Sequence, residues 1–188
     1  MKKETKKQLL IGAALVLELL FLLLYLNGRI DRLLDSDMSS EMILGQLLAR
    51  NNGILSDQWY YSTELRVLNT QLIYALFFRL SSNWHFVRMA STLVLWCVLI
   101  ASYGVLCRVM GCKKSFGVTA LLLAAPVSES YFRFVLAGVY YVPHLAIAFA
   151  ALALNEVYFK AQTDRKKFWL VVSVLLALVA GLGGPREI

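Results

Sequence analysis

The sequence predicts an all-α protein, a polytopic membrane helix bundle with about five transmembrane helices and one long external loop carrying interfacial amphipathic helices. Hydrophobic residues make up 59% of the 188 positions and charged residues only 16%, whereas soluble proteins carry about 25% charged residues. Basic residues stand in short blocks beside the apolar runs, which is typical of cytoplasmic loops. Because little polar sequence lies outside one loop, residues 1–188 are predicted to form a single membrane domain.

The first apolar run, 8–27, follows the basic head "MKKETKK" and is longer than the core of a signal peptide. No small-residue cleavage site follows it. We therefore expect a retained transmembrane helix in the cell membrane, with a cytoplasmic N-terminus. Glu18 stands in the middle of this run, where an ionisable side chain costs about 2.5 to 3.5 kcal/mol on insertion scales. It is expected to face another helix rather than lipid.

Three further runs, 86–107, 137–159 and 168–183, are predicted spans, and two segments are ambiguous. The segment 67–80 is short for a span, and 116–132 is apolar only in its first half. If 67–80 crossed the membrane, the basic block after the next helix would lie outside, against the charge bias. We therefore expect 116–132 to cross the membrane and 67–80 to lie in the interface, with the C-terminus outside.

This threading makes residues 28–85 one long external loop. Within it, Asp35 and Asp37 follow the outer end of the first span by a few residues. A carboxylate in that position can act as a general base on a hydroxyl of an acceptor. Alternatively, Asp37 caps a helix that begins near Met38. The two carboxylates are also a candidate pair for a divalent cation, because hard cations prefer oxygen ligands.

The order of these segments resembles the start of the GT-C fold glycosyltransferases, which include the protein O-mannosyltransferases and the lipid A aminoarabinose transferases. The resemblance rests on the outward-running first helix followed by "DSDMSSE", "LLARNNGILSDQWYY" and "NTQLIYALFFRL". In that superfamily an acidic residue of the first external loop opens a helix and precedes a Gly-containing turn. Asp37 with Gly53 matches this offset, and Asp35 matches it less well. The resemblance implies a catalytic carboxylate and sugar transfer from a polyprenyl-phosphate donor to an external acceptor.

The resemblance continues through "CRVMGCKKSFGVTALLLAAPVSESYFR", which is similar to the family's basic cytoplasmic turn, short helix and second external loop. Two positions depart from the family pattern. Met38 stands where many relatives have an acidic residue, and Glu129 is the candidate for the Asp expected in the second loop. Some family members need a divalent cation and others do not, so the sequence leaves this cofactor open. Because family members are longer, the chain is expected to be the N-terminal portion of a longer protein or an inactive truncated relative.

A polyprenyl-phosphate donor requires cationic side chains at the outer interface, where arginine suits bidentate phosphate contact. The arginines near that level are Arg66, Arg79, Arg88, Arg133 and Arg186. Arg133 and Arg186 are the candidate phosphate ligands, because Arg133 shares a polar loop with Glu129 and Arg186 follows the flexible "GLGG". The alternative is that an arginine snorkels to the headgroups, which is favoured for Arg66 and Arg79.

The remaining polar and aromatic residues receive a structural interpretation. His85 and His144 lack a third nitrogen or sulfur ligand at metal spacing, so no zinc site is predicted. The aromatic groups "QWYY" and "VYYVPH" are expected at the bilayer interfaces. The bilayer is an expected partner, whereas nucleic acid is not, because the basic residues stand beside apolar runs rather than on a soluble face.

The alternative class of protein is a non-enzymatic multi-span scaffold or accessory subunit that associates through its helices. Small residues in "GAAL" near Gly12 and "FAALAL" near Ala150 suit close helix packing. The two classes differ at Asp37. A scaffold is expected to tolerate Asp37→Asn, whereas a transferase is not.

Overall fold

The computed structural model describes residues 2–61, 68–161 and 163–182, and in these ranges every regular element is a helix. The all-α class is therefore confirmed. The elements in chain order are α1 (Lys2–Asn27), α2 (Ser36–Asn51), α3 (Thr70–Phe78), α4 (Trp84–Val109), α5 (Phe116–Ala124), α6 (Glu129–Tyr131), the π-helix η1 (Phe132–Ala137), α7 (Val142–Lys160) and α8 (Thr163–Leu182).

Three helices in the described ranges are long and apolar enough to cross a membrane: Lys6–Asn27 within α1, all of α4 and all of α7. A fourth candidate exists only if α5 and the following α6–η1 segment are counted as one broken span. The predicted span 168–183 falls in α8, which ends at the last described residue, Leu182. The interfacial segment predicted at 67–80 contains α3, a helix of nine residues.

The segment predicted as one span at 116–132 is broken in the structure. Its two helical parts meet at an angle of 88°. The cause is local, because the residue before a proline is driven out of the helical region. Ala125, which precedes Pro126, has an extended ψ of 135° and ends α5. The Ser128 side chain then accepts a hydrogen bond from the Tyr131 amide and starts a new helix in another direction.

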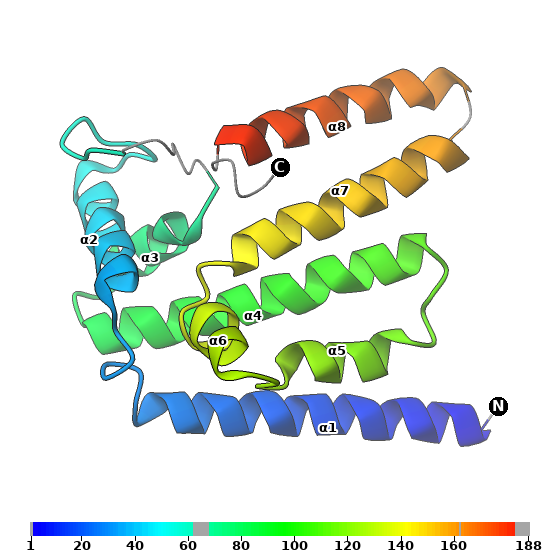
Figure 1. The fold of residues 1–188 in the computed structure, drawn as a ribbon, viewed down its shortest axis with the longest axis horizontal. Coiled ribbons are helices and arrows are strands. Elements are labelled where there is room, and N and C mark those ends of the chain that lie inside the picture. The colour runs from blue at the N-terminus through cyan, green and yellow to red at the C-terminus, as the bar shows by residue number, and fades with distance from the viewer. Residues whose placement is uncertain (1, 62–67, 162, 183–188) are drawn as a thin grey trace.

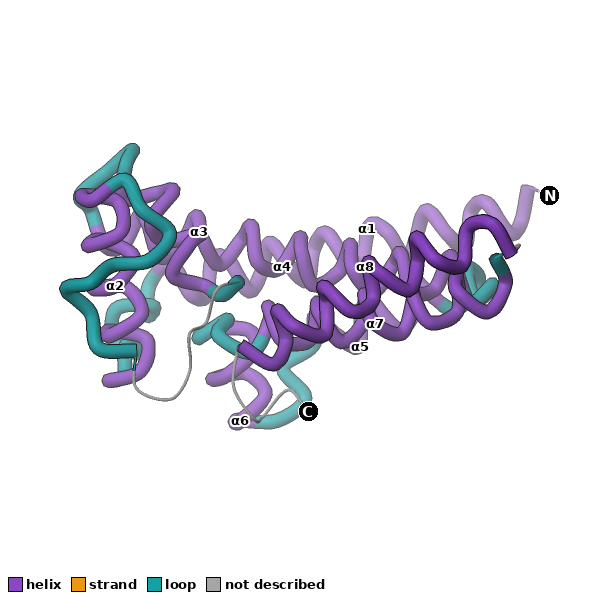
Figure 2. Tube along the Cα trace, turned by 90° about the horizontal axis from the view of Figure 1, so that it is seen from above, coloured by secondary structure: helices purple, strands orange, loops and turns teal. Residues whose placement is uncertain are grey.

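The long helices α1, α4, α7 and α8 run along the molecule, with α5 between α1 and α4, and the α2–α3 pair stands across one end (Figure 1). The packing contacts follow this order: α1 against α5, α4 against α7, and α7 against α8. Figure 2 shows from a second side that α2 and α3 lie at the end opposite to the N-terminus and the α7–α8 connection.

The main apolar core lies where α1, α4 and η1 meet, toward the end that carries α2. Leu26, Trp96 and Leu136 are almost fully buried there, and the Trp96 Nε1–H donates to the Leu136 carbonyl at 2.9 Å. Elsewhere on α1, apolar side chains such as Leu17 and Phe21 are exposed. This is the expected surface of a membrane helix, because lipid tails are as apolar as leucine.

Helix α2 packs directly on α3, and each begins with a side-chain cap. Asp35 Oδ1 accepts from the Met38 amide at 2.9 Å, and Asn69 Oδ1 accepts from the Thr70 amide at 2.8 Å. At the contact between the two helices, a Cβ atom added to Gly45 would lie 2.6 Å from Tyr74 Cβ. Glycine at this position therefore allows the two backbones to approach closely.

Charge is distributed unequally between the two ends of the bundle. The start of α1, the α4–α5 connection and the α7–α8 connection lie together at one end (Figure 1), which we call the basic end. Its described basic residues are Lys6, Lys7, Arg108, Lys113, Lys114, Lys160, Arg165, Lys166 and Lys167. The opposite end, which we call the acidic end because most of the described carboxylates lie there, carries Asp31, Asp35, Asp37, Glu41 and Asp57, together with Arg29, Arg32, Arg50, Arg79 and Arg88.

Candidate functional site

The two predicted catalytic carboxylates have different environments at the start of α2. Asp35 is half-buried, and one of its oxygens accepts the Met38 amide hydrogen bond that caps the helix. Asp37 is exposed in the first turn. The alternative that Asp37 is the cap is therefore wrong, because α2 begins at Ser36, ahead of the predicted start, and its cap is Asp35. Asp37 is accessible to a molecule approaching from outside the bundle.

Beneath this first turn lies a layer of buried polar side chains from α2, α3 and α4. Glu41 is only 5% exposed, and Thr70 Oγ1 donates a hydrogen bond to Glu41 Oε2. Tyr74 is almost fully buried beside them. Burial raises the pKa of Tyr74 well above its usual range, and the nearby Glu41 charge raises it further. The Tyr74 hydroxyl is therefore a neutral hydrogen-bonding group at every physiological pH.

The side chain of Arg88 extends from α4 to this layer of polar side chains and contacts Met38 of α2. Its side chain is 2% exposed, and Nη2 donates to Met38 Sδ at 2.8 Å, although a thioether is a weak acceptor. The negative charges of Asp35 and Asp31 favour the charged form of the guanidinium. Its Nη1 has no hydrogen-bond partner among the residues that the structure describes. An unsatisfied buried donor costs about 1 to 3 kcal/mol, and more for a charged group.

The same face of α4 carries two more buried polar atoms next to Arg88. Ser91 and Thr92 are fully buried, and neither hydroxyl has a partner within the described ranges. Ser91 and Thr92 follow Arg88 by one turn, so one cationic donor and two hydroxyl donors lie close together in the interior, and donors of these kinds are those that bind an anion.

The connection between η1 and α7 brings a tyrosine to the same place. Val139 is fully buried and has a φ of 56°, which is an outlier for a β-branched residue. At the preceding Gly138, an added Cβ would lie 2.8 Å from Met38 Cε. Burial raises the pKa of Tyr140 to about 12, and the negative charges of Asp35, Asp37 and Glu41 contribute. Backbone strain of this kind is characteristic of functional sites.

Of the two predicted phosphate ligands, Arg133 lies within the described residues and makes its contact with Glu129. Arg133 Nη1 lies 4.0 Å from Glu129 Oε1 on the adjacent turn, and both side chains are at least half exposed. Glu129 in turn lines a groove of about 260 Å³ with Tyr25 and Phe132. Arg186 and Arg66 lie outside the described residues. The arginine that interacts with Asp35 is Arg88, which the sequence places near the outer interface without distinguishing it from the others.

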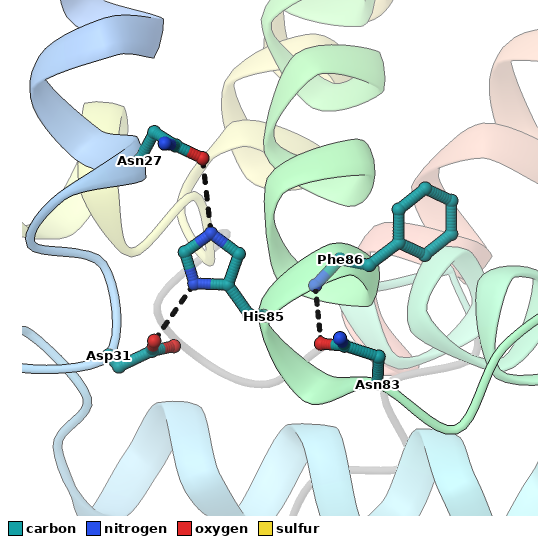
Figure 3. Close-up of polar contacts among 5 residues, drawn as sticks. All are labelled: Asn27, Asp31, Asn83, His85 and Phe86. Atoms are coloured by element: carbon teal, nitrogen blue, oxygen red, sulfur yellow. Dashed lines mark hydrogen bonds and ion pairs between the residues drawn. The ribbon is translucent and has the colours of Figure 1, made fainter.

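A second polar contact joins the C-terminal end of α1 and the loop after it to the start of α4 (Figure 3). His85 Nδ1 lies 2.8 Å from Asp31 Oδ2, and its Nε2 lies 3.1 Å from Asn27 Oδ1. Asn83 caps the same end of α4 by accepting from the Phe86 amide at 3.1 Å. Within the described ranges, no group of three or more His, Cys, Asp or Glu side chains has the geometry of a metal site.

Sequence reasoning missed Arg88, Tyr140 and the strained Val139 as parts of one site. Arg88 and Met38 are fifty positions apart, so no local spacing relates them. The sequence predicts an interfacial position for Tyr140, as for the neighbouring aromatics. At residue 139, where φ is positive, the sequence has valine rather than glycine. Comparison with known protein families, with curated proteins and with solved structures finds no match to this chain.

Proposed function

We propose that the chain is a GT-C-type integral membrane glycosyltransferase, which transfers a sugar from a polyprenyl-phosphate donor to an external acceptor at the acidic end of the bundle. The observation that carries this proposal is the buried Arg88 guanidinium, whose Nη1 is unpaired, beneath the carboxylates of α2. The order of spans and loop helices, which resembles the start of that superfamily, supports it independently.

The proposed topology has five spans in the cell membrane, a cytoplasmic N-terminus and residues 28–85 outside. It is supported by the distribution of lysine, because the described lysine side chains all lie at the basic end and cytoplasmic loops carry an excess of lysine and arginine. The acidic end then faces outward. A lipid-linked donor would reach Arg88 at the level of the headgroups, where α4 begins, by displacing the side chains that cover it.

In this proposal Asp37 is the general base, because it is the exposed carboxylate of the pair. It takes the proton from an acceptor hydroxyl while that oxygen bonds to the anomeric carbon. The bond between the anomeric carbon and the phosphate oxygen breaks, and polyprenyl phosphate leaves with the bonding electrons. Arg88, with Ser91 and Thr92, balances the negative charge on the leaving phosphate. Asp35 positions α2 as its cap.

The phosphate ligand is tested with undecaprenyl phosphate, added to the protein in detergent while the thermal unfolding temperature is measured. Binding to the folded state raises this temperature. Arg88→Met is expected to abolish the rise while the variant still unfolds cooperatively. The exposed Arg133→Met is the matched control and is expected to retain the rise. An unchanged response of Arg88→Met would overturn the role of Arg88.

The base is tested in vesicles with a panel of undecaprenyl-phosphate sugars, by measuring release of undecaprenyl phosphate. Asp37→Asn is expected to slow release by about a hundredfold or more, as for a lost general base. Asp57→Asn removes an exposed carboxylate from the same loop and is expected to leave the rate unchanged. Equal rates in the two variants would eliminate Asp37 as the base.

A specific observation also favours the alternative, a scaffold that binds another helix. A shallow apolar groove of about 820 Å³ runs along α1, lined by Leu9, Gly12, Ala13 and Val16. An added Cβ at Gly12 would meet nothing within 4 Å, so another backbone could approach there. Association that depends on Gly12 in a membrane two-hybrid assay, together with a silent Asp37→Asn variant, would favour the scaffold.

A further inference from the structure

The basic end contains a groove that the proposed glycosyl transfer does not use. It lies where the ends of α4 and α7 meet the start of α8, and its volume is about 650 Å³. Its lining includes Arg108, Val157, Lys160, Arg165 and Trp169. Three separate helices thus bring cationic side chains to one concave surface.

The cations of this groove are not equally neutralised. Lys160 Nζ lies 2.8 Å from Glu156 Oε1 and donates to the Val109 carbonyl at 3.0 Å. Arg108 and Arg165 are exposed, and neither has an ion-pair partner among the described residues. The two guanidinium groups therefore carry the uncompensated positive charge of the groove.

The helix dipoles account for the positions of only some of the cations in and near this groove. The C-termini of α4 and α7 attract cations, and Lys160 already donates to a terminal carbonyl of α4. Arg165, Lys166 and Lys167, however, stand near the N-terminus of α8, where the dipole disfavours cations. Asp164 is the one acidic residue of that sequence block. An anion in the groove would satisfy both the arginines and the start of α8.

Trp169 indicates the depth of the groove in the membrane. It lies half-buried in the groove wall, one turn beyond Arg165. Tryptophan gathers at the level of the headgroups, because its ring is apolar and its N–H is polar. Lys166 lies nearby, with Nζ 5.8 Å from the centre of the Tyr158 ring. Basic grooves between membrane helices at this level suit phosphate headgroups.

We propose that this groove binds the phosphate headgroup of an anionic phospholipid from the surrounding leaflet, with Arg108 and Arg165 as its phosphate ligands. Arginine suits this role because its planar guanidinium contacts two phosphate oxygens at once. The lipid joins the ends of α4 and α7 to the start of α8. The site lies at the end opposite to Arg88 and is independent of the proposed sugar transfer.

The test uses the purified protein in detergent, titrated with dioctanoyl phosphatidylglycerol while the thermal unfolding temperature is followed. Dioctanoyl phosphatidylcholine and inorganic phosphate are titrated in parallel. The anionic lipid is expected to raise the unfolding temperature, whereas the other two probes are not. Equal effects of both lipids would overturn an anion site, and an equal effect of inorganic phosphate would overturn the lipid as its source.

The ligands are tested by comparing R108Q/R165Q with K113Q/K114Q, which removes two charges from the same end outside the groove lining. Because a direct hydrogen bond to a charged group contributes about tenfold or more in affinity, the groove variant, which loses both arginine contacts, should bind phosphatidylglycerol at least about tenfold more weakly. The control should bind as the parent does. Equal weakening in both would show a general charge effect and overturn the site.

If R108Q/R165Q does not fold, R108K/R165K keeps the charge and removes only the bidentate contact. It is expected to bind phosphatidylglycerol more weakly than the parent, and parental affinity would overturn the assignment of ligands. Release of undecaprenyl phosphate from its sugars should be unchanged in this variant. Failure of the lipid site is thus distinguishable from failure of the proposed transferase.

Discussion

The Arg88 guanidinium and the two aspartates above it show how strongly neighbouring side chains can differ in role. Arg88 has lost its water, and its described hydrogen-bond acceptor is a methionine sulfur. One carboxylate oxygen of Asp35 accepts a hydrogen bond from a backbone amide, whereas Asp37 is exposed on the helix surface. Asp35 therefore stabilises the start of α2 as its N-cap, whereas the carboxylate of Asp37 remains accessible to a substrate.

This division predicts different effects of alanine at the two positions. Asp35→Ala should lower the free energy of unfolding by about 1 kcal/mol, the usual cost of losing an N-cap. Asp37→Ala should lower it by only about 0.3 kcal/mol, the loss of one exposed charge near the helix N-terminus. Urea unfolding in mild detergent, followed by circular dichroism, measures both. A larger loss for Asp37→Ala would contradict the assigned cap.

The raised pKa of Tyr140 predicts that the free energy of unfolding depends on pH. Its pKa in the folded protein, about 12, lies above the ordinary value of 10. The folded state therefore holds the phenol proton more tightly than the unfolded state does. The resulting stability is fully present below pH 10 and is lost as the pH rises through about 12. Tyr140→Phe should lose less stability across this interval than the parent. Parallel stability curves would contradict the environment assigned to Tyr140.

Among the elements, the α2–α3 pair depends on a close approach that one glycine permits. Gly45→Ala would place a methyl group against Tyr74 Cβ and the Gln71 carbonyl. We expect a loss of about 1 to 3 kcal/mol, as for other overpacked contacts. Gly12→Ala on α1 is the matched control, because nothing lies within 4 Å of the added Cβ. The thermal unfolding temperature in detergent should fall for the first variant and not for the second.

A comparison of the predicted apolar runs with the observed helices shows which elements can be predicted from the sequence. The runs 8–27 and 86–107 coincide with α1 and α4, because long apolar runs have few alternatives to helix. The run 116–132 does not form one helix, because Pro126 overrides its apolar composition.

The site was predictable only in part. The sequence indicates the carboxylates at the start of α2, since an acidic cluster after a span is visible locally. The contact of Arg88 with Met38 joins distant segments, and Tyr140 follows a non-glycine residue with positive φ, Val139. Neither leaves a local pattern.

At the scale of the whole molecule, the position of the described lysine side chains at one end predicts the orientation in the membrane. In a background with Cys97, Cys107 and Cys112 replaced by serine, Asp57→Cys should react with an impermeant maleimide in intact cells. Lys114→Cys should react only after the cells are permeabilised, because the basic end is proposed to be cytoplasmic. Both positions are exposed, so access to reagent is not limited by burial. The opposite labelling pattern would reverse the proposed topology.

The break at Pro126 has a consequence for biosynthesis. Helix α5 has nine residues and is about 14 Å long, less than half of the roughly 30 Å hydrocarbon core. Such a segment cannot partition into the bilayer as an autonomous unit. In the folded protein α5 packs along α1, and an added Cβ at Gly117 would lie 2.6 Å from Ile11 Cγ2. Because α1 precedes α5 in the chain, it has already been synthesised when α5 emerges from the ribosome, and we expect α5 to enter the membrane by packing against it.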